Sequence, residues 1–429
     1  MIGVNSMSQK DGKKTKYIQV ISIAILAVSM LSVFLNAGLG VFFGPLMALI
    51  FIYLYFSECS EFVTAVIVVA NDALGTMVLG KISFAYLLLV LALIKILQKK
   101  KHNVLMFVFI LLSTVLLLEL YAVEFLDMRS VIYSLCFIVA LAAMEKHEEK
   151  QNMFFFGVAF TVVLIAIHTC ITGGVEFIDV ESYGVVRKGI IGVGVGDSNY
   201  SCFLLNIGII CLWSTKKIPM LIKGLLTLPI LYAMTVTLST SGLLALLIIL
   251  ILGIMSQKGK IKALGVLLIV VLVIVIIFNF YTQLPAEQRI VQVDAYIERM
   301  SDKLDAFGVG DMDEVTTGRT NLAGEFWSYI WSQPVLSLFF GGNSLILYNG
   351  GAVPHNTYIG FILQTGLIGA VLFFGFVILR CVKQTLALKQ NPILKTPILL
   401  KVIALFFALN LSFCQGSLWA VWMYILVLL

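Results

Sequence analysis

Long uninterrupted apolar runs recur along the whole chain, and they constrain its fold more than any other feature. A helix needs about 20 apolar residues to cross the hydrocarbon core of a bilayer. Residues 104–121, 153–171, 261–280 and 358–379 form the clearest runs of about that length. Inside hydrocarbon every backbone N–H and C=O must be paired within the protein, so these runs have to be helical. A soluble enzyme with buried strands would instead show apolar runs of only about four to eight residues.

The composition supports the same fold class. Of 429 residues, 60% are hydrophobic and 12% are charged, whereas a soluble domain keeps roughly a quarter of its residues charged. We therefore predict an all-α, polytopic transmembrane bundle with about 12 to 14 spans. The expected spans are 18–35, 41–56, 62–79, 82–97, 104–121, 129–144, 153–171, 199–213, 219–235, 240–255, 261–280, 357–379, 398–413 and 415–429.

The amino-terminal segment is predicted to be a basic cytoplasmic tail followed by a first transmembrane helix. Lysines between Lys10 and Lys16 precede the apolar residues 18–35. A secretory signal peptide would end in a small-residue cleavage site. The sequence has none there, and another hydrophobic segment follows at once.

Neither a metal nor another cofactor is predicted. The seven cysteines form no CxxC pair, and most of them lie inside predicted spans, which indicates apolar packing residues. The sequence contains no HExxH or GxSxG motif and no His/Asp/Glu cluster with metal-ligand spacing. The formal net charge of +6 does not indicate nucleic acid, because the cations follow the membrane topology.

The basic residues predict the orientation of the bundle. Short connections between spans place successive basic clusters on one side, and cytoplasmic loops carry an excess of Lys and Arg. We therefore predict a multi-pass protein of the bacterial cytoplasmic membrane with a cytoplasmic N-terminus. The clusters are the N-terminal lysines, Lys95/Lys99/Lys100/Lys101, Lys146/Lys150, Lys216/Lys217, Lys258/Lys260/Lys262 and Arg380/Lys383/Lys389/Lys395.

The opposite side carries most of the acids and two long loops, at about residues 172–198 and 281–356. Loops of this length are usually functional or disordered. The second loop is predicted to be structured, with an amphipathic helix on the membrane surface and then an aromatic helix that follows Arg319 and ends before Pro334. The amphipathic positions are Ile290, Val293, Ile297, Met300 and Leu304, and the aromatic ones are Phe326, Trp327, Tyr329 and Trp331.

These boundaries divide the chain into four parts. They are the N-terminal spans 1–171, the central spans with the first outer loop 172–280, the large outer loop 281–356 and the C-terminal spans 357–429.

Cations on the outer side are candidate ligands for phosphate. Arg187 and Lys188 lie in the first long loop, and Arg319 lies in the second. A guanidinium presents a planar fork of donors that matches phosphate oxygens, so arginines from both loops would suit a pyrophosphate. In the alternative interpretation they pair with acids of the same loops. Those acids are Glu176, Asp179, Glu181 and Glu325.

Other polar residues stand where outer loops meet spans. His355 precedes Asn356, and Asn356 or Thr357 is expected to cap the following helix. A neutral imidazole there could accept a proton from a sugar hydroxyl, and the alternative is a solvated or hydrogen-bonded histidine. Asp197 or Asn199 is expected to cap the span that follows the first loop. Asp72 is a carboxylate deep in a predicted span, a position that makes it a functional candidate.

Four segments, taken in order, resemble the O-antigen polymerase and O-antigen ligase family of membrane proteins. The likeness covers roughly residues 190–380 and depends on the order, the spacing and the common outward face of the segments. They are Gly196 to Tyr200 (GDSNY), Thr237 to Leu244 (TLSTSGLL), Gly318-Arg319 leading to Trp327, Pro334 and Gly341-Gly342, and Pro354 to Tyr358 (PHNTY) with Gln364 to Gly369 (QTGLIG).

The resemblance implies a metal-independent glycosyltransferase whose donor is a glycan on undecaprenyl pyrophosphate. Arg319, Arg187 and Lys188 would bind the pyrophosphate, and His355 would orient or deprotonate the acceptor hydroxyl. The expected supporting residues are Asp197, Asn199, Asn356 and Ser239. The sequence departs from the family at one position, because Thr240 stands where members often have Arg.

The resemblance leaves three functions open. The first is polymerisation of lipid-linked repeat units into capsule or O-antigen polysaccharide. The second is ligase-type transfer of a finished glycan to a lipid or protein. A transporter or flippase is the third, although it predicts charged residues along the spans, whereas nearly all charges lie in loops. The expected partners are the lipid-linked glycan, the bilayer and other polysaccharide-export components, without nucleic acid.

Overall fold

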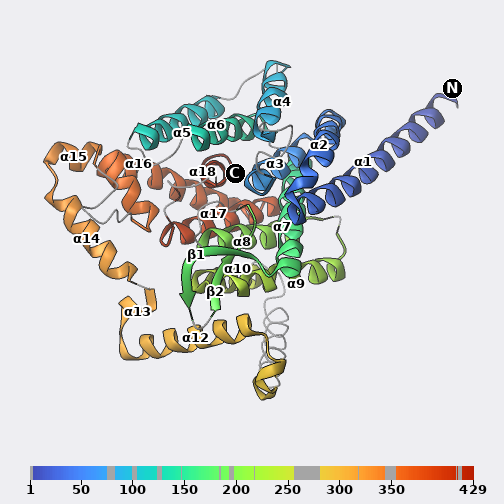
Figure 1. The fold of residues 1–429 in the computed structure, drawn as a ribbon. Helices are drawn as coiled ribbons and strands as arrows, with labels where there is room; N and C mark the ends of the chain where they lie inside the picture. Colours follow the sequence, from blue (N-terminus) through green and yellow to red (C-terminus); the bar gives the residue numbers. More distant parts are fainter. Residues whose placement is uncertain are drawn as a thin grey trace.

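The computed structural model describes residues 3–74, 83–98, 104–122, 128–145, 147–182, 185–192, 198–216, 218–255, 281–316, 318–343, 354–411, 413 and 418–429. Helices make up nearly all of this structure, and one two-stranded sheet is the only sheet in the described part (Figure 1). Several helices are long and apolar. The fold is therefore the all-α, polytopic membrane bundle that the apolar runs predict.

Each predicted span except 261–280, which lies outside the described residues, falls on a helix. The N-terminal helices are α1 (Gly3–Leu35), α2 (Gly40–Leu54), α3 (Ser60–Leu74), α4 (Phe84–Gln98), α5 (Val104–Ala122), α6 (Met128–Ala142) and α7 (Glu148–Thr172), with the turns η1 (Ala37–Leu39) and η2 (Tyr55–Cys59). The later spans are α8 (Ser198–Ser214), α9 (Met220–Val236), α10 (Thr240–Met255), α16 (Thr357–Ala387), α17 (Lys395–Ala408) and α18 (Trp419–Met423), with the turns η5 (Pro392–Leu394) and η7 (Tyr424–Leu428).

Within the described residues, four helical stretches are long and apolar enough to cross a membrane alone. They are Lys16–Leu35, Ala37–Leu74, Glu148–Thr172 and Thr357–Ala387. Other apolar stretches of the described part have 10–17 residues, which is shorter than the roughly 20 that a bilayer requires. Several of these are buried by their neighbours, among them α8 and α18.

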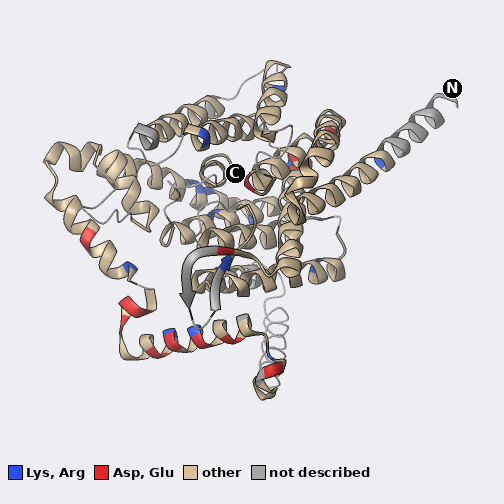
Figure 2. Ribbon diagram, viewed as in Figure 1, with Lys and Arg blue, Asp and Glu red and all other residues tan. Residues whose placement is uncertain are grey.

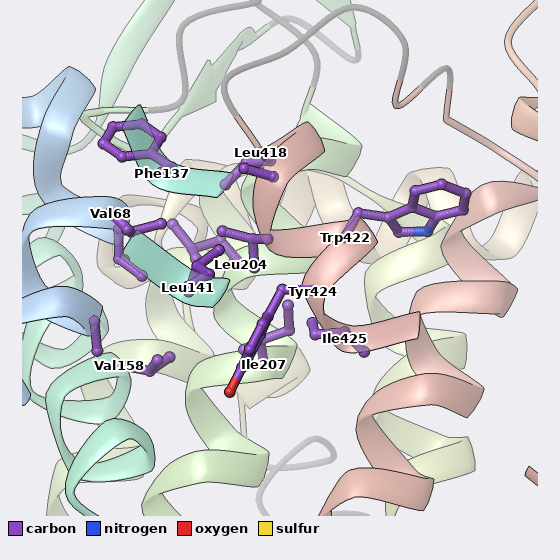
Figure 3. Packing of buried hydrophobic residues seen from close by; sticks show 14 of the residues in the cluster. Val68, Phe137, Leu141, Val158, Leu204, Ile207, Leu418, Trp422, Tyr424 and Ile425 are labelled. Carbon is purple, nitrogen blue, oxygen red and sulfur yellow. The ribbon is translucent and has the colours of Figure 1, made fainter. Parts of the chain in front are cut away.

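The centre of the bundle is built around α7, which packs against α3 on one side and α8 on another. The approach to α3 is so close that a Cβ at Gly157 would lie 2.7 Å from the carbonyl oxygen of Phe62. Figure 3 shows side chains of α3, α6, α7, α8 and α18 meeting in one core, among them Val68, Val158 and Leu204. Interiors this tight leave no room for an added methyl group. Outer helices instead expose apolar side chains such as Phe42 and Leu372 toward the bilayer.

One end of the bundle carries a buried ion network, and we call it the lysine-rich end. The Glu61 side chain at the start of α3 is fully buried, and Lys95 Nζ lies 2.6 Å from its Oε1. Lys150 Nζ lies 3.8 Å from the other Glu61 oxygen, and Glu145 lies 3.7 Å from Lys95. Ser60 donates to Glu61 at 2.9 Å. The network ties α3, α4, the segment after α6 and α7 together.

Further contacts link loops of the same end. Lys216 after α8 pairs with Glu148 at the start of α7, and Thr396 donates to Ser214 at 2.8 Å. These residues all fall on the side that the basic clusters define. The contacts therefore agree with the predicted alternation of the spans.

The other end carries the long loops, and we call it the loop-bearing end. α7 separates the two ends, because its 25 residues correspond to about 37 Å of helix. The first loop contains an antiparallel hairpin of β1 (Val175–Ser182) and β2 (Val185–Gly189). The hairpin replaces what was predicted only as a loop, and residues 175–189 are rich in β-branched valine, which favours strands.

The second loop forms an arc of helices beside the bundle (Figure 1). Both predicted helices are confirmed, because the amphipathic one is α12 and the aromatic one is α14, which begins at Arg319 and ends before Pro334. Gly318 precedes α14 in the left-handed conformation, with φ of 76°. The elements are η3 (Ala286–Gln288), α12 (Val291–Val309), α13 (Met312–Thr316), α14 (Arg319–Ser332) and α15 (Val335–Phe340).

We predict that Glu61→Leu destabilises the protein more than the double change Glu61→Leu/Lys95→Leu. The single change leaves the largely buried ammonium of Lys95 without its closest carboxylate, at a cost of about 3 kcal/mol, whereas removing both charges of a buried pair is often nearly neutral. Thermal unfolding in nanodiscs measures the difference. Glu148→Leu, which breaks the solvent-exposed pair with Lys216, is the matched control and should change the free energy of unfolding by at most about 1 kcal/mol. Additive effects of the two changes would contradict the network.

Candidate functional site

The start of α8 is joined to the start of α10 at the loop-bearing end. Ser239 Oγ donates to Asn199 Oδ1 at 2.7 Å, and both residues are buried. Ser239 also accepts from the backbone N–H of Gly242 at 3.3 Å, so it caps the first turn of α10. These contacts unite two segments of the family resemblance that lie 40 residues apart in the chain.

A strained turn directs Ser239 inward. Leu238 is buried and has φ of 51°, a left-handed conformation that a non-glycine residue adopts at a cost of about 1–3 kcal/mol. On the same side, Cys202 Sγ lies 3.0 Å from Thr237 Oγ1. Asn206 donates to the carbonyl oxygens of Cys202 and Gly242 at 2.9 and 3.3 Å. The turn between α9 and α10 is therefore fixed against α8 by polar contacts.

The start of α8 is also joined to the start of α16. The Tyr200 ring meets the Phe413 ring edge to face, with centroids 5.9 Å apart. The Phe413 N–H donates to Thr357 Oγ1 at 3.0 Å, and that hydroxyl donates to the Leu411 carbonyl. Asn356 accepts from the Ile359 N–H at 3.2 Å, which confirms its predicted role as the helix cap.

Together these residues form what we call the helix-start cluster. It consists of Asn199, Tyr200, Ser239, Thr357 and Phe413, which are all buried. It joins the N-termini of α8, α10 and α16 at one end of the bundle. The N-terminus of a helix carries partial positive charge and unpaired N–H groups. Three such ends in one cluster favour an anion on the loop-bearing side.

The remaining two segments of the resemblance meet at a break inside α16. Gly366 has φ of 69°, and it interrupts the helix. The N–H groups of Gly342 and Asn343 donate to the carbonyl oxygens of Gln364 and Leu363, both at 3.0 Å. The glycine pair that ends α15 is thus attached to the second half of the loop-ending segment.

The hairpin stands directly on this end of the bundle. The Ile190 N–H donates to Ser201 Oγ on α8 at 3.3 Å. Beyond it, the backbone at Gly192 packs so closely on α3 that an added Cβ would lie 2.8 Å from the N atom of Ala73. At the base of the hairpin, Lys188 pairs with Glu176 at 3.3 Å, one of the acids that the alternative interpretation gives as partners of the arginines. Arg187 lies on β2, but its side chain, like Asp197, lies outside the described residues.

Arg319 and His355 occupy different elements. Arg319 opens α14, is half-buried, and forms no ion pair within the part of the chain that the structure describes, so the predicted alternative of a Glu325 partner is not observed. His355 is half-buried beside Asn356 and Thr357, which places it next to the helix-start cluster. Among the described residues no hydrogen bond joins Arg319 to that cluster. Their meeting in one pocket stays a prediction.

One buried arginine was not among the predicted site residues. Arg299 on α12 is only 7% exposed, and α12 contacts β2. Lys303, one turn later, is also buried and donates to the backbone of Glu314 and Val315. The four-residue spacing of these two cations on an amphipathic helix was a usable signal. The predicted apolar positions Ile290 and Leu304 are instead exposed, as expected for a helix on a membrane surface.

A second polar group lies at the outer end of α3. Asn71 donates to Asp72 at 2.8 Å and accepts from Ser83 at 2.7 Å. Asn71 is buried, whereas Asp72 is half-buried. Asp72 lies on α3, and residues 75–82 of the predicted span 62–79 and its following connection lie outside the described part, so the depth of this carboxylate in the span stays a prediction.

Comparison with models of known protein families, with curated proteins and with solved structures finds no match to this chain. The family resemblance stays a hypothesis. It depends on the four segments and on the contacts described above.

We predict that Ser239→Ala lowers the free energy of unfolding by about 1–3 kcal/mol, because it removes a buried donor and a helix cap together. Ser328→Ala is the matched control, since Ser328 is exposed and donates only within α14. A double-mutant cycle with Asn199→Ala measures the pair. Independent effects of the two substitutions would show that the hydrogen bond does not join the helices.

We also predict that Gly366→Ala lowers the melting temperature by about 5 °C or more. The added Cβ would overlap the carbonyl of Phe339, and φ of 69° is unfavourable for alanine. Gly375→Ala in the same helix is the control, because its Cβ would enter open space. Equal melting temperatures for the two variants would contradict the close approach of α15 and α16.

Proposed function

We propose that this protein is an extracytoplasmic glycosyltransferase that polymerises undecaprenyl-pyrophosphate-linked repeat units into capsule or O-antigen polysaccharide. One observation carries the proposal. The segments that resemble the polymerase and ligase family are far apart in the sequence, yet contacts bring them together in the fold. At the loop-bearing end Ser239 pairs with Asn199, and Phe413 links Tyr200 to Thr357. Gly342 meets Gln364 farther along α16, at its break.

The geometry supports binding of an anionic headgroup at the bilayer edge. The helix-start cluster directs three helix N-termini to the loop-bearing end, and these favour phosphate. Thr240 opens α10, and its Oγ1 is buried without a hydrogen-bond partner among the described residues. An unpaired buried hydroxyl is costly, so a ligand oxygen would satisfy it. Thr240 occupies the position where the family often has Arg.

The outer arc supplies the cations. Arg319 has no acidic partner among the described residues, and it is free to neutralise a pyrophosphate that leaves during the reaction. Arg187 and Lys188 lie on β2 at the same end, and α12, which carries the buried Arg299, contacts β2. The Lys188 pair with Glu176 is partly exposed, so exchanging this carboxylate for phosphate costs little.

The proposed reaction uses these residues. The acceptor hydroxyl oxygen attacks the anomeric carbon of the donor sugar and forms the new glycosidic bond. The bond from that carbon to the pyrophosphate oxygen breaks, and undecaprenyl pyrophosphate leaves with the electron pair. His355 accepts the hydroxyl proton, because imidazole is the side chain that most often acts as a general base. Asn356, held as a helix cap, fixes the backbone beside it.

The orientation is part of the proposal. The lysine-rich end faces the cytoplasm because of the excess of Lys and Arg in its loops, and the loop-bearing end faces outward. The protein then lies in a bacterial cytoplasmic membrane with a cytoplasmic N-terminus. Its substrate comes from the outer leaflet, and other polysaccharide-export components take the product.

We predict that His355→Ala and Arg319→Ala each abolish polymer while the protein still inserts in the membrane. The first removes the proton acceptor, and the second removes charge stabilisation of the leaving group, so each should lower polymer at least about 100-fold. Gel analysis of surface glycans in a complemented deletion strain measures this. His147→Ala at the lysine-rich end and Arg289→Ala, whose residue pairs with Asp294 at 3.5 Å, are the matched controls.

The same gels separate the alternative functions. Single-repeat glycans in the deletion strain indicate a polymerase, unattached long chains indicate a ligase, and lipid-linked units retained in the cytoplasm indicate a flippase. Normal long-chain product from the His355 or Arg319 variant would remove that residue from the mechanism.

A further inference from the structure

The segment around α15 has the surface of a membrane-embedded element. Leu336 and Phe340 are 74% and 68% exposed, and Trp331, Val335 and Phe339 are exposed as well. No Asp, Glu, Lys or Arg occurs anywhere in residues 326–379. The earlier helices of the arc are more charged, so that Figure 2 shows α12 striped with both signs, α13 with acids only and α15 with neither. Water-facing loops carry charges, and this one has none.

The residues that follow α15 contact the backbone of α16 at the break in that helix. The N–H groups of Gly342 and Asn343 donate to the carbonyl oxygens of Gln364 and Leu363 at the break in α16. Asn343 also donates from its side chain to the Ser337 carbonyl at 3.1 Å, which closes the end of α15. A Cβ on Gly341 or Gly366 would overlap the opposite backbone. The two backbones are therefore in direct contact.

The contact lies deep within the span. Gly366 follows Thr357 by nine residues and precedes Arg380 by fourteen, which correspond to about 14 Å and 21 Å of helix. The hydrocarbon core is about 30 Å thick, and Arg380 is the first charged residue after the break. The contact with residues 341–343 thus falls near the middle of the apolar part of α16.

The hydrogen bonds at the break fit a location in hydrocarbon. A broken helix leaves carbonyl groups unpaired, and lipid offers them no donor. Irregular backbone is tolerated at that depth only where protein satisfies it. Gly342 and Asn343 provide these donors for Leu363 and Gln364. A loop lying in water would not need to meet this requirement.

We propose that residues 334–343 re-enter the bilayer beside α16, and that the exposed side chains of α15 contact the acyl chains of bilayer lipids. Lipid is identified as the partner because the exposed apolar surface of α15 is continuous with that of α16. On α16 the exposed residues just past the break are Ile368, Val371 and Leu372, which face the same lipid as the rest of that span. The apolar surface of α15 extends this lipid-facing surface sideways. The proposal is independent of the catalytic function.

Nitroxide labels test the depth of the segment. Leu336→Cys and Phe340→Cys are labelled in a full-length chain whose native cysteines are replaced, reconstituted in nanodiscs of phosphatidylcholine alone. Collision with oxygen reports lipid, and collision with a water-soluble nickel chelate reports water. Leu372→Cys on α16 is the lipid reference, and Asp302→Cys on the charged, exposed face of α12 is the water reference. We expect both α15 labels to match Leu372, with an oxygen-to-nickel ratio several-fold above that at Asp302.

Two outcomes would overturn the proposal. A water-like ratio at both α15 positions would place the segment outside the bilayer. Spin–spin broadening between labels of neighbouring copies would assign the surface to a second copy of the chain. If the cysteine-free protein fails to fold, a second experiment keeps the native cysteines and places the photoreactive residue benzoylphenylalanine at position 336. Its crosslinks show whether this position contacts lipid or water. Crosslinking to phospholipid supports re-entry, and a modification by water alone contradicts it.

Discussion

Backbone groups that enter hydrocarbon must find partners within the protein, and the architecture of this bundle depends on that constraint. The apolar spans meet it by forming helices. Where a long helix breaks, the freed carbonyls receive donors from neighbours. At the kink between α2 and α3, Gln19 and Lys150 donate to the carbonyl oxygens of Ser57 and Glu58 at 2.7 and 2.9 Å. At Gly366 the donors are backbone N–H groups of the segment after α15. Each break is thus bonded to another element and fixes that element against the broken helix.

The same constraint favours polar side chains at the two ends of the bundle. Their interactions differ between the ends. At the lysine-rich end, opposite charges are paired around Glu61, and this network holds α3, α4 and α7 together. At the loop-bearing end, the helix-start cluster is held by neutral contacts such as Ser239 with Asn199. Neutral hydrogen bonds leave the positive helix ends uncompensated. This electrostatic difference favours the loop-bearing end as the place for the anion that the proposed function requires.

The sequence predicted the helices well and the contacts between them poorly. Spans and the helices α12 and α14 follow from run length and periodicity, which are local properties. The hairpin was missed because Phe177 and Ile178 interrupt the alternation of apolar and polar residues in β1. α15 was treated as part of an outer loop because its six residues are far below the length that marks a span. The bond from Ser239 to Asn199 crosses 40 residues, so only the tertiary fold determines it. The individual motif residues could be identified from the sequence, but which of them contact one another in the fold could not.

The break at Gly366 also links the arc of outer helices to the bundle. α14 carries Arg319 at its first residue and leads through Pro334 into α15, which is anchored at Gly341 and Gly342. The helix of 14 residues is a rod of about 21 Å, and it also contacts α16 directly. His355 lies on the bundle side of the break, next to the capped start of α16. The backbone contact between the glycines therefore helps to hold the helix that carries Arg319 against the helix that follows His355. A side chain at Gly341 or Gly366 would overlap the opposite backbone, and it would change the position of α14 relative to α16 without altering Arg319 or His355.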